Sequence, residues 1–191
     1  MWQIPEADLQ VLGDVAGKDV LELGCGAAQW SISLAGLGAR TVGLDLSPKQ
    51  LEHARTAMAG AGVEFPLVEA SAEDVPLEDE SFDVVVLGEL LEHLPMPDRT
   101  VAEARRVLRS GGRLVGSVPN AFRLKSRLVF LAGRPPESDP THLHLFSPSA
   151  VRELLADFDQ VQLRFVAGRL TRLHPRLFAN DICFRARKPP R

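Results

Sequence analysis

Long apolar runs are absent from this chain of 191 residues, since none approaches the roughly 18 residues of a membrane-spanning helix. The opening residues, 1–6, carry neither the basic segment nor the apolar segment of a secretion signal. Cysteine is scarce, and two cysteines do not form a disulfide framework. These absences exclude an integral membrane protein and a small disulfide-stabilised domain, so we expect a cytoplasmic protein without a membrane partner.

The composition supports one compact domain. Apolar residues make up 45% of the chain and charged residues 25%, which is enough to build a core beneath a polar surface. The length exceeds the commonest domain size of about 100 to 150 residues. A single sheet with helices on both faces nevertheless uses all of it, so no second domain is required.

Charge is distributed unevenly along the chain. The net charge is −3, but residues 123–191 hold 13 Lys and Arg against 6 Asp and Glu. Such a basic region suits an anionic ligand, although arginines scattered over a solvated surface produce the same count. Nucleic acid is accordingly not the favoured partner.

Strand-like and helix-like segments alternate along the chain. Ser47, Pro48 and Gln50 together mark a helix start, with a capping hydroxyl, a proline in the first turn and a capping-box partner. Helices are predicted at about 6–15, 28–37, 48–60, 98–109, 121–132 and 148–156. Strands are predicted near 18–23, 40–45, 63–69, 83–88, 113–118, 160–167 and 180–186. The alternation predicts an α/β fold with a doubly wound, seven-stranded, mostly parallel sheet and helices on both faces.

The most informative segment joins an apolar strand to a glycine turn. Residues 20–23 run into Gly24 and Gly26, which let the backbone approach a ligand without a Cβ in the way. Asp45 follows Gly24 by 21 residues, at the end of the next predicted strand, which is the spacing of a ribose-binding carboxylate. Gln29 stands where the dinucleotide fingerprint has its third glycine, which disfavours a pyrophosphate ligand.

Four motifs in this order resemble those of the class I S-adenosylmethionine-dependent methyltransferases. They are the E-x-G-x-G pattern from Glu22, the acid at Asp45, the loop at 70–73 and the D-x-S-F-D sequence at 79–83. The last two resemble the ubiquinone/menaquinone-biosynthesis (type 11) group. The resemblance covers most of residues 18–119 and implies a Rossmann-like fold with S-adenosylmethionine as cofactor and S-adenosylhomocysteine as product. It also implies methyl transfer by in-line displacement to a small-molecule acceptor, at oxygen, carbon or nitrogen in that order of preference.

Carried over residue by residue, the resemblance implies a binding role for each motif. Asp45 would hold the ribose hydroxyls, Leu46 would pack on adenine, and the Ala72 amide would meet an adenine nitrogen. Glu22 would help to orient the methionine amine. Ser71 stands where relatives usually have an aspartate that accepts from the adenine amino group, so that bond would lack charge assistance. The expected cofactor-binding set is Glu22, Gly24, Gly26, Asp45, Leu46, Gln50, Ser71, Ala72, Glu73 and Gly88.

Two polar clusters supply the catalytic candidates. One is the segment 89–93, just past the strand predicted at 83–88, and the other is 142–144, after a loop at 134–140 that is a candidate lid. We take His93, Glu92 and His144 as catalytic, because a carboxylate and an imidazole can remove a proton from an acceptor that must lose one. Residues 18–119 then form a cofactor-binding core, and residues 120–191 supply the substrate side and the last two strands of one domain, 1–191.

A metal-assisted reaction is an alternative. The spacing E-x-x-E-H at Glu89, Glu92 and His93 resembles the signature of magnesium-dependent O-methyltransferases of quinone biosynthesis and of small-RNA 3′-end 2′-O-methyltransferases, with His142 or His144 as a later ligand. Such a set suits Mg²⁺ or Mn²⁺ and an acceptor with a vicinal diol or catechol. Metal-free relatives share part of this segment, so we predict no metal site and keep this set as the alternative.

The acceptor side is less clearly marked. Trp2, Phe122, Phe130 and Phe146 could line an apolar acceptor pocket or lie in the ordinary core. A third alternative for the whole chain is a catalytically silent cofactor-binding module that regulates a partner. The oligomeric state stays open, with a homodimer as one option.

Overall fold

The computed structural model describes residues 12–135, 139–167, 171 and 173–190. Most of the helix predicted at 6–15 lies outside these residues, as does Trp2. Leu12 is helical and residues 13–15 are not, so that helix ends earlier than predicted.

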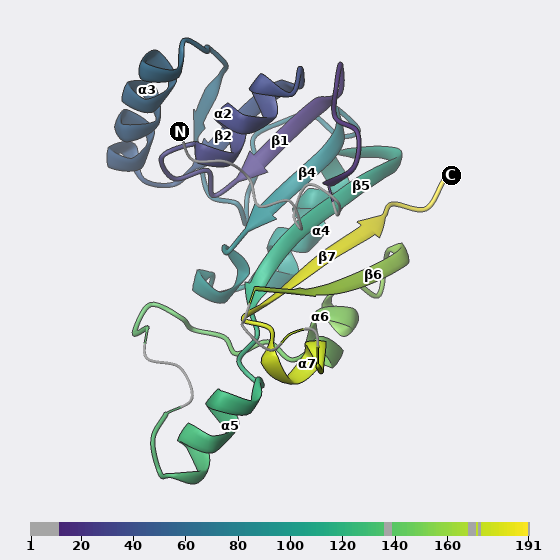
Figure 1. Ribbon diagram of the computed structural model, residues 1–191. Helices are drawn as coiled ribbons and strands as arrows, with labels where there is room; N and C mark the ends of the chain where they lie inside the picture. The colour runs from purple at the N-terminus through teal and green to yellow at the C-terminus, as the bar shows by residue number, and fades with distance from the viewer. Residues whose placement is uncertain (1–11, 136–138, 168–170, 172, 191) are drawn as a thin grey trace.

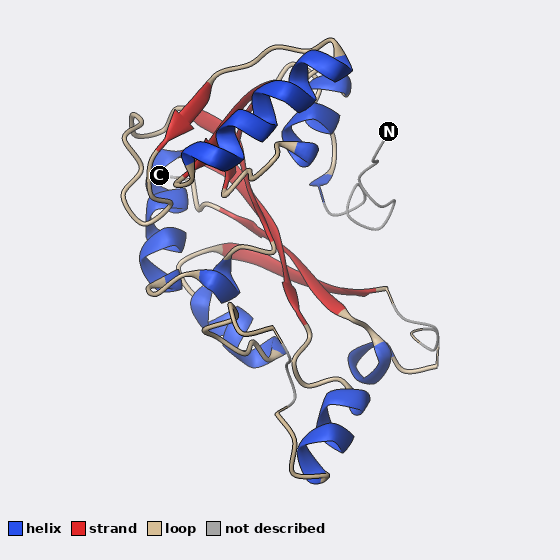
Figure 2. Cartoon of the chain, turned by 90° about the vertical axis from the view of Figure 1, so that its left-hand side faces the viewer, coloured by secondary structure: helices blue, strands red, loops and turns tan. Residues whose placement is uncertain are grey.

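One sheet of seven strands organises the fold, in the order β3-β2-β1-β4-β5-β7-β6 (Figures 1 and 2). The first five strands pair in parallel, whereas β7 pairs antiparallel with β5 and β6 pairs antiparallel with β7. This order confirms the predicted seven-stranded, mostly parallel sheet. The strands are β1 (Asp19–Leu23), β2 (Arg40–Asp45), β3 (Leu67–Glu69), β4 (Phe82–Gly88), β5 (Leu108–Pro119), β6 (Asp159–Val166) and β7 (Asp181–Arg187).

Helices cover both faces of the sheet, as Figure 2 shows. Alternate residues of β4 point to opposite faces, because side chains along a strand repeat every two residues. Val84 and Val86 pack with Leu34 in one buried cluster, whereas Val85 and Leu87 lie in another with residues of α4 and α6. The helices are α2 (Gln29–Gly36), α3 (Pro48–Ala61), the single-turn η1 (Leu91–His93), α4 (Pro97–Val107), α5 (Leu124–Leu131), α6 (Pro148–Leu154) and α7 (Pro175–Phe178).

The start of α3 follows from its local sequence. The Ser47 hydroxyl accepts a hydrogen bond from the Gln50 N–H at 3.4 Å, and Pro48 occupies the first turn. Ser147 and Pro148 repeat this arrangement at α6, where the Ala150 N–H donates to the Ser147 hydroxyl at 3.1 Å. A hydroxyl followed by proline thus begins two of the described helices, as capping chemistry predicts.

Strand β5 differs most from the prediction. It begins at Leu108 rather than near 113, so the helix predicted at 98–109 ends at Val107. The pairing of β4 with β5 shifts register between Phe82 and Val84, and Gly111 lies in this stretch at φ +74°. A shift in register depends on the partner strand and leaves no mark in the local sequence. The sequence pattern therefore predicted only the regular second half of β5, from about residue 113. The third strand is also shorter than predicted, and η1 and α7 were not predicted.

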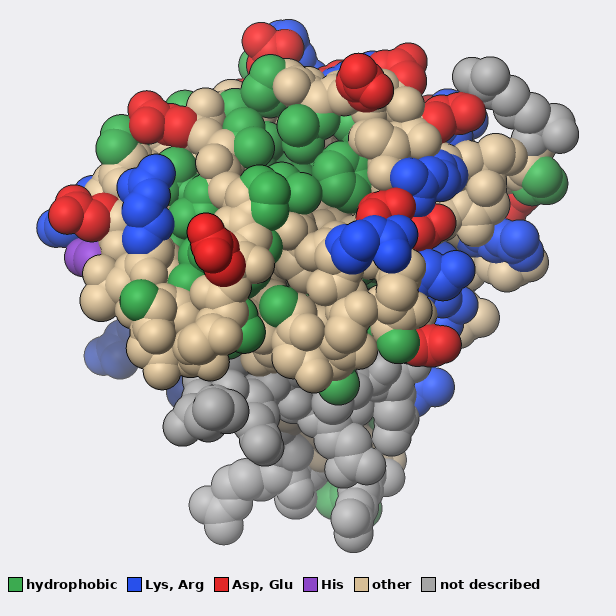
Figure 3. All heavy atoms as spheres, turned by 90° about the horizontal axis from the view of Figure 1, so that it is seen from above, with side chains coloured by type: hydrophobic (Ala, Val, Ile, Leu, Met, Phe, Trp, Pro, Cys, Tyr) green, Lys and Arg blue, Asp and Glu red, His purple; other side chains and the backbone are tan. Residues whose placement is uncertain are grey.

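No helix among the described residues is long and apolar enough to cross a bilayer. Figure 3, the view from above, shows hydrophobic side chains gathered in the middle of this face and acidic and basic side chains beside one another along one side. Mixed charge of this kind does not favour a polyanion on this face.

Candidate active site

The carboxyl ends of the parallel strands meet at one edge of the sheet. Leu23 at the end of β1 pairs with Leu44 of β2, and Asp45 pairs with Glu69 at the end of β3. The loops that follow these strands are therefore neighbours. In open α/β sheets this edge is where ligands bind. We call the loops that follow β1 to β4 the rim.

The glycine turn presents bare backbone to the rim. Gly24 and Gly26 both have left-handed φ values, +68° and +51°, which favour glycine. No atom lies within 4 Å of the place where a Gly26 Cβ would be, so the backbone is open there. A Cβ on Gly24 would come within 2.5 Å of the Leu90 side chain, so residue 24 also has no room for one. Burial raises the pKa of the Cys25 thiol to about 12, which excludes a thiolate nucleophile in this turn.

Asp45 ties the glycine turn to the second strand. One carboxylate oxygen accepts a hydrogen bond from the Gly26 N–H at 2.8 Å, and the other accepts from the Ser47 N–H at 2.8 Å. Each carboxylate oxygen can accept more than one hydrogen bond, so Asp45, which is partly exposed, keeps capacity for hydroxyl groups. Leu46 follows with its side chain 69% exposed, an apolar surface next to that carboxylate.

Glu22 lies beneath this surface rather than on it. Its side chain is buried and accepts hydrogen bonds from the N–H and the hydroxyl of Ser31, in the first turns of α2. Burial raises the pKa of Glu22 to about 8, against the opposing effect of the two Ser31 hydrogen bonds. Near neutral pH the carboxyl is therefore largely protonated in the absence of a positively charged ligand.

The loop after β3 lies beside Asp45. The Ala70 N–H donates to the backbone oxygen of Asp45 at 3.2 Å. The Ser71 hydroxyl accepts from the Glu73 N–H at 3.1 Å, which is a local turn of the kind that serine favours. Glu73 in turn accepts from the Met96 N–H at 2.6 Å, so its carboxylate connects this loop to the start of α4.

The other three residues of the predicted cofactor-binding set differ in their exposure to solvent and in their surroundings. Ala72 is buried, and Gln50 is exposed in the first turn of α3. Gly88 ends β4, and a Cβ there would lie 3.4 Å from the indole nitrogen of Trp30. Gly88 therefore gives Trp30 room to approach the end of β4.

The two polar clusters predicted from sequence lie side by side in the structure. The N–H groups of Leu143 and His144 both donate to the backbone oxygen of Glu92, at 2.7 and 3.2 Å. The His93 Nδ1 lies 3.1 Å from the hydroxyl of Thr141 and 3.2 Å from its backbone oxygen. These bonds hold the segment after the candidate lid against η1.

His142, rather than His144, completes this cluster. The rings of His93 and His142 meet edge to face with centroids 4.7 Å apart. One ligand atom each from Glu92, His93 and His142 lies within 4.8 Å of the other two, a spacing that could hold a cation. Among the described residues, neither His144 nor Glu89 belongs to this group.

The two residues outside the group have other surroundings. His144 lies against Phe146, with ring centroids 6.1 Å apart. Glu89 is exposed at a left-handed φ of +49°, and its N–H donates to the backbone oxygen of Ser117 in β5 at 3.2 Å. No periodicity in the loop distinguishes His142 from His144, so the sequence could not select between them.

The aromatic residues proposed for an acceptor pocket differ in how far they are buried. Phe146 is part of the buried core, whereas Phe122 and Phe130 are exposed. Residues 136–138 of the candidate lid lie outside the described residues.

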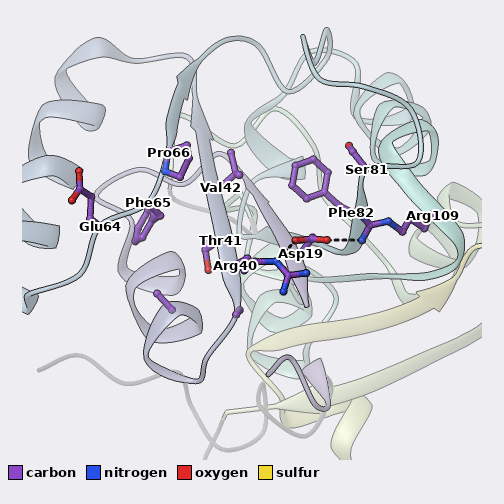
Figure 4. A pocket seen from close by; sticks show the side chains of 12 residues that line it. Asp19, Arg40, Thr41, Val42, Glu64, Phe65, Pro66, Ser81, Phe82 and Arg109 are labelled. Atoms are coloured by element: carbon purple, nitrogen blue, oxygen red, sulfur yellow. Dashed lines mark hydrogen bonds and ion pairs between the residues drawn. The ribbon is translucent and has the colours of Figure 1, made fainter. Parts of the chain in front are cut away.

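A cavity of about 560 Å³ lies at the opposite edge of the sheet (Figure 4). Arg40 and Arg109 converge there on Asp19, at 2.6 and 2.8 Å, and Arg109 also reaches Asp83 at 3.0 Å. The hydrogen bonds from the two arginines lower the pKa of Asp19 to about 2. We assign this network to stability, because it joins the starts of β1, β2 and β5, far from the ligand edge.

Comparisons with known proteins agree with this geometry. Residues 21–116 match a family model described as a methyltransferase domain. The chain is 40% identical over 107 residues to a ubiquinone biosynthesis O-methyltransferase of Aromatoleum aromaticum, covering 56% of this chain and 46% of that protein. It is 38% identical over 116 residues to a demethylmenaquinone methyltransferase of Clavibacter sepedonicus, covering 60% and 46%.

The chain spans about half the length of the curated relatives it matches. Its fold is similar to the crystal structure of a SAM-dependent methyltransferase from Methanosarcina mazei, with a TM-score of 0.75 and 20% identity over all of both chains. At that identity the likeness concerns the fold alone.

Proposed function

This chain belongs to the class I S-adenosylmethionine-dependent methyltransferases and is similar to the ubiquinone/menaquinone-biosynthesis group, and we propose that it methylates a small-molecule acceptor. The observation that carries the proposal is the hydrogen bond from the Gly26 N–H to Asp45. It joins the open glycine turn (Gly24 and Gly26) to the partly exposed carboxylate of Asp45 at the edge of the sheet where ligands bind. We call these residues the cofactor cradle. When bound there, S-adenosylmethionine supplies a methyl group on a positively charged sulfur.

The residues of the rim fit this cofactor. Asp45 accepts from the two ribose hydroxyls with its remaining lone pairs, and Leu46 packs its exposed side chain on the adenine. The Ala72 amide and the Ser71 hydroxyl contact the adenine edge. Glu22 lies beneath this site. A positively charged ligand favours loss of the proton from the Glu22 carboxyl, and the resulting carboxylate then pairs with the charge of the ligand.

The favoured acceptor is a hydroxylated aromatic ring methylated at oxygen. One named relative is an O-methyltransferase of ubiquinone biosynthesis and the other a demethylmenaquinone methyltransferase; both names support an acceptor of quinol type, and the first supports transfer to oxygen. A phenolic oxygen must lose its proton to accept a methyl group, and Glu92 and His93 are the groups we assign to that step. His142 contacts His93 and takes the third place that the sequence pattern gave to His144. Positioning and exclusion of water supply the rest of the rate enhancement.

A metal-assisted version is a second candidate, favoured by the cluster of Glu92, His93 and His142 within 4.8 Å. Mg²⁺ or Mn²⁺ held there could fix a vicinal diol or catechol and lower the pKa of its attacking hydroxyl. Paramagnetic resonance of added Mn²⁺ tests this without turnover. Mn²⁺ bound by the native protein and lost in Glu92→Gln supports the metal site, whereas equal signals in both proteins, or no bound Mn²⁺, exclude it.

Isothermal calorimetry with S-adenosylmethionine and S-adenosylhomocysteine is the decisive experiment for the proposed function. We expect micromolar binding by the native protein, at least tenfold weaker binding by Asp45→Ala, and no change in the control Asp157→Ala, an exposed acid beyond α6. Absence of binding by the native protein would overturn the proposal. Binding without turnover on any quinol, catechol or amine acceptor would favour the silent regulatory module instead.

A further inference from the structure

Helix α5 has its polarity reversed relative to an ordinary surface helix. Surface helices normally turn apolar side chains to the core and polar ones to water. In α5 the small polar residue Ser126 is 4% exposed, whereas Leu128 and Leu131 are 57% and 80% exposed. Leu124, Leu128 and Leu131 share one side of the helix because they are spaced by four and three residues. The helix therefore presents a leucine stripe to solvent.

This helix also projects from the body of the protein. Figures 1 and 2 show α5 beyond the carboxyl end of β5, apart from the sheet. It begins five residues after Pro119, where β5 ends. The stripe thus lies on the side of the molecule toward which the strands and their rim point.

Positive charge surrounds the stripe. Residues 121–135 contain four cationic side chains and no acid. Lys125 and Arg127 are both exposed, and helical geometry places them on either side of the leucine stripe. The other two are Arg123, which binds the Asn180 side chain, and Arg134 after the helix.

A groove runs along the same surface. It has a volume of about 550 Å³ and is lined by five apolar and two cationic side chains. These are Leu124, Leu128, Val129, Ala132 and Phe178, with Lys125 and Arg134. Exposed apolar surface rimmed by charge is typical of an interaction site.

We propose that α5 docks this protein onto an anionic lipid surface, with the leucine stripe entering the headgroup region and the four cations contacting lipid phosphates and carboxylates. Apolar side chains flanked by Lys and Arg are the pattern of helices that lie in a membrane interface. The net charge of the whole chain is negative, and within the basic region 123–191 this segment carries four of the 13 Lys and Arg and none of the six Asp and Glu.

A second copy of the chain suits this surface less well. A symmetric dimer across α5 would bring the same four cations against their own copies, and like charges across an interface are unfavourable. An anionic bilayer offers opposite charge and an apolar layer at once. The contact is peripheral and revises the expectation from sequence that no membrane takes part; it does not depend on the proposed methyl transfer.

Co-sedimentation with lipid vesicles tests this proposal. The native protein is expected to sediment with vesicles of equal parts phosphatidylcholine and phosphatidylserine, and to stay in solution with phosphatidylcholine alone. Binding should fall as salt is raised, because salt screens exposed charges. The double variants Leu128→Ser/Leu131→Ser and Lys125→Gln/Arg127→Gln should each bind about tenfold more weakly.

Matched controls separate docking from general effects. Leu37→Ser removes an exposed leucine at the end of α2, and Arg55→Gln removes an exposed cation on α3; both should bind like the native protein. Thermal unfolding and calorimetry with S-adenosylmethionine should be unchanged in all four variants.

Several results would overturn the proposal. One is equal sedimentation with both kinds of vesicle or with neither. Another is loss of binding in the charge variant alone, because the leucines would then not enter the lipid. A third is a dimer of the native protein that dissociates in the leucine variant while the vesicles are ignored, which would assign α5 to a second copy of the chain.

Discussion

The Asp45 carboxylate accepts a hydrogen bond from the backbone N–H of Gly26 at 2.8 Å, across the 19 residues that separate them in sequence. Its other oxygen accepts from the Ser47 N–H, so the carboxylate is held in one orientation before any ligand arrives. Asp45 thereby connects the turn after β1 with the turn after β2. A preformed acceptor of this kind loses little conformational freedom when a ribose binds.

Replacing Asp45 with alanine should weaken binding of S-adenosylmethionine at least tenfold, a loss of about 1.4 kcal/mol or more. The variant loses the ribose acceptor and also the bond that orients the glycine turn. Calorimetry on Asp45→Ala and Asp45→Asn gives the comparison, since asparagine keeps one acceptor oxygen and should fall between alanine and the native residue. Unchanged affinity in both variants would remove the ribose role.

Changing Ser71 to aspartate should tighten cofactor binding. The Ser71 hydroxyl already accepts from the Glu73 N–H, and a carboxylate can keep that bond while accepting from the adenine amino group with charge assistance. We expect a gain of a few-fold, measured by calorimetry against the neutral variant Ser71→Asn. If aspartate and asparagine give the same affinity as serine, Ser71 does not contact adenine.

Replacing His93 with alanine should reduce turnover while leaving cofactor affinity nearly unchanged. His93 lies in the polar cluster with Glu92 and His142 rather than in the cofactor cradle. Initial rates on the methyl acceptor and calorimetry with S-adenosylmethionine separate the two effects. His142→Ala should resemble His93→Ala, whereas His144→Ala should be milder because its ring lies against Phe146. The reverse order would restore His144 as the third member.

Stability should fall as pH rises because of Glu22. The pKa of its carboxyl is about 8 in the folded chain against an ordinary value of 4.5, so the folded state binds more protons between these values. By linkage, this contribution is present in full below about pH 4.5 and is lost as pH rises through about 8. Glu22→Gln stays neutral and should flatten the profile, as measured by urea unfolding across this range. Parallel profiles for the two proteins would count against a buried, protonated Glu22.

Protonation of Asp19 should lower the free energy of unfolding as pH falls, which is the opposite direction to the effect of Glu22. Its folded pKa is about 2 against 3.8, so its contribution is present above about pH 4 and is lost as pH falls through about 2. Because Arg40 is largely exposed, we expect only about 1 kcal/mol at neutral pH. The free energies of unfolding of the native protein and Asp19→Asn should therefore differ at neutral pH and converge near pH 2. A constant difference would show that the loss is not electrostatic.

Features that depend only on neighbouring residues could be predicted from the amino-acid sequence. Gly24 and Gly26 predict a turn because only glycine enters left-handed φ values freely, and Ser47 with Pro48 predicts the start of α3 because capping is local chemistry. The alternation of helices and strands was enough to predict the sheet, since the period of an apolar pattern is fixed by the backbone. The spacing of Asp45 from Gly24 followed from the same alternation.

Contacts between groups that are distant along the chain could be seen only in the folded protein. His142 rather than His144 lies against His93, because backbone hydrogen bonds to Glu92 set the course of an irregular loop. The raised pKa of Glu22 depends on burial, which a motif does not state. The outward leucines of α5 likewise became visible only once the helix was placed, because an apolar residue in a sequence carries no sign of whether the fold will cover it.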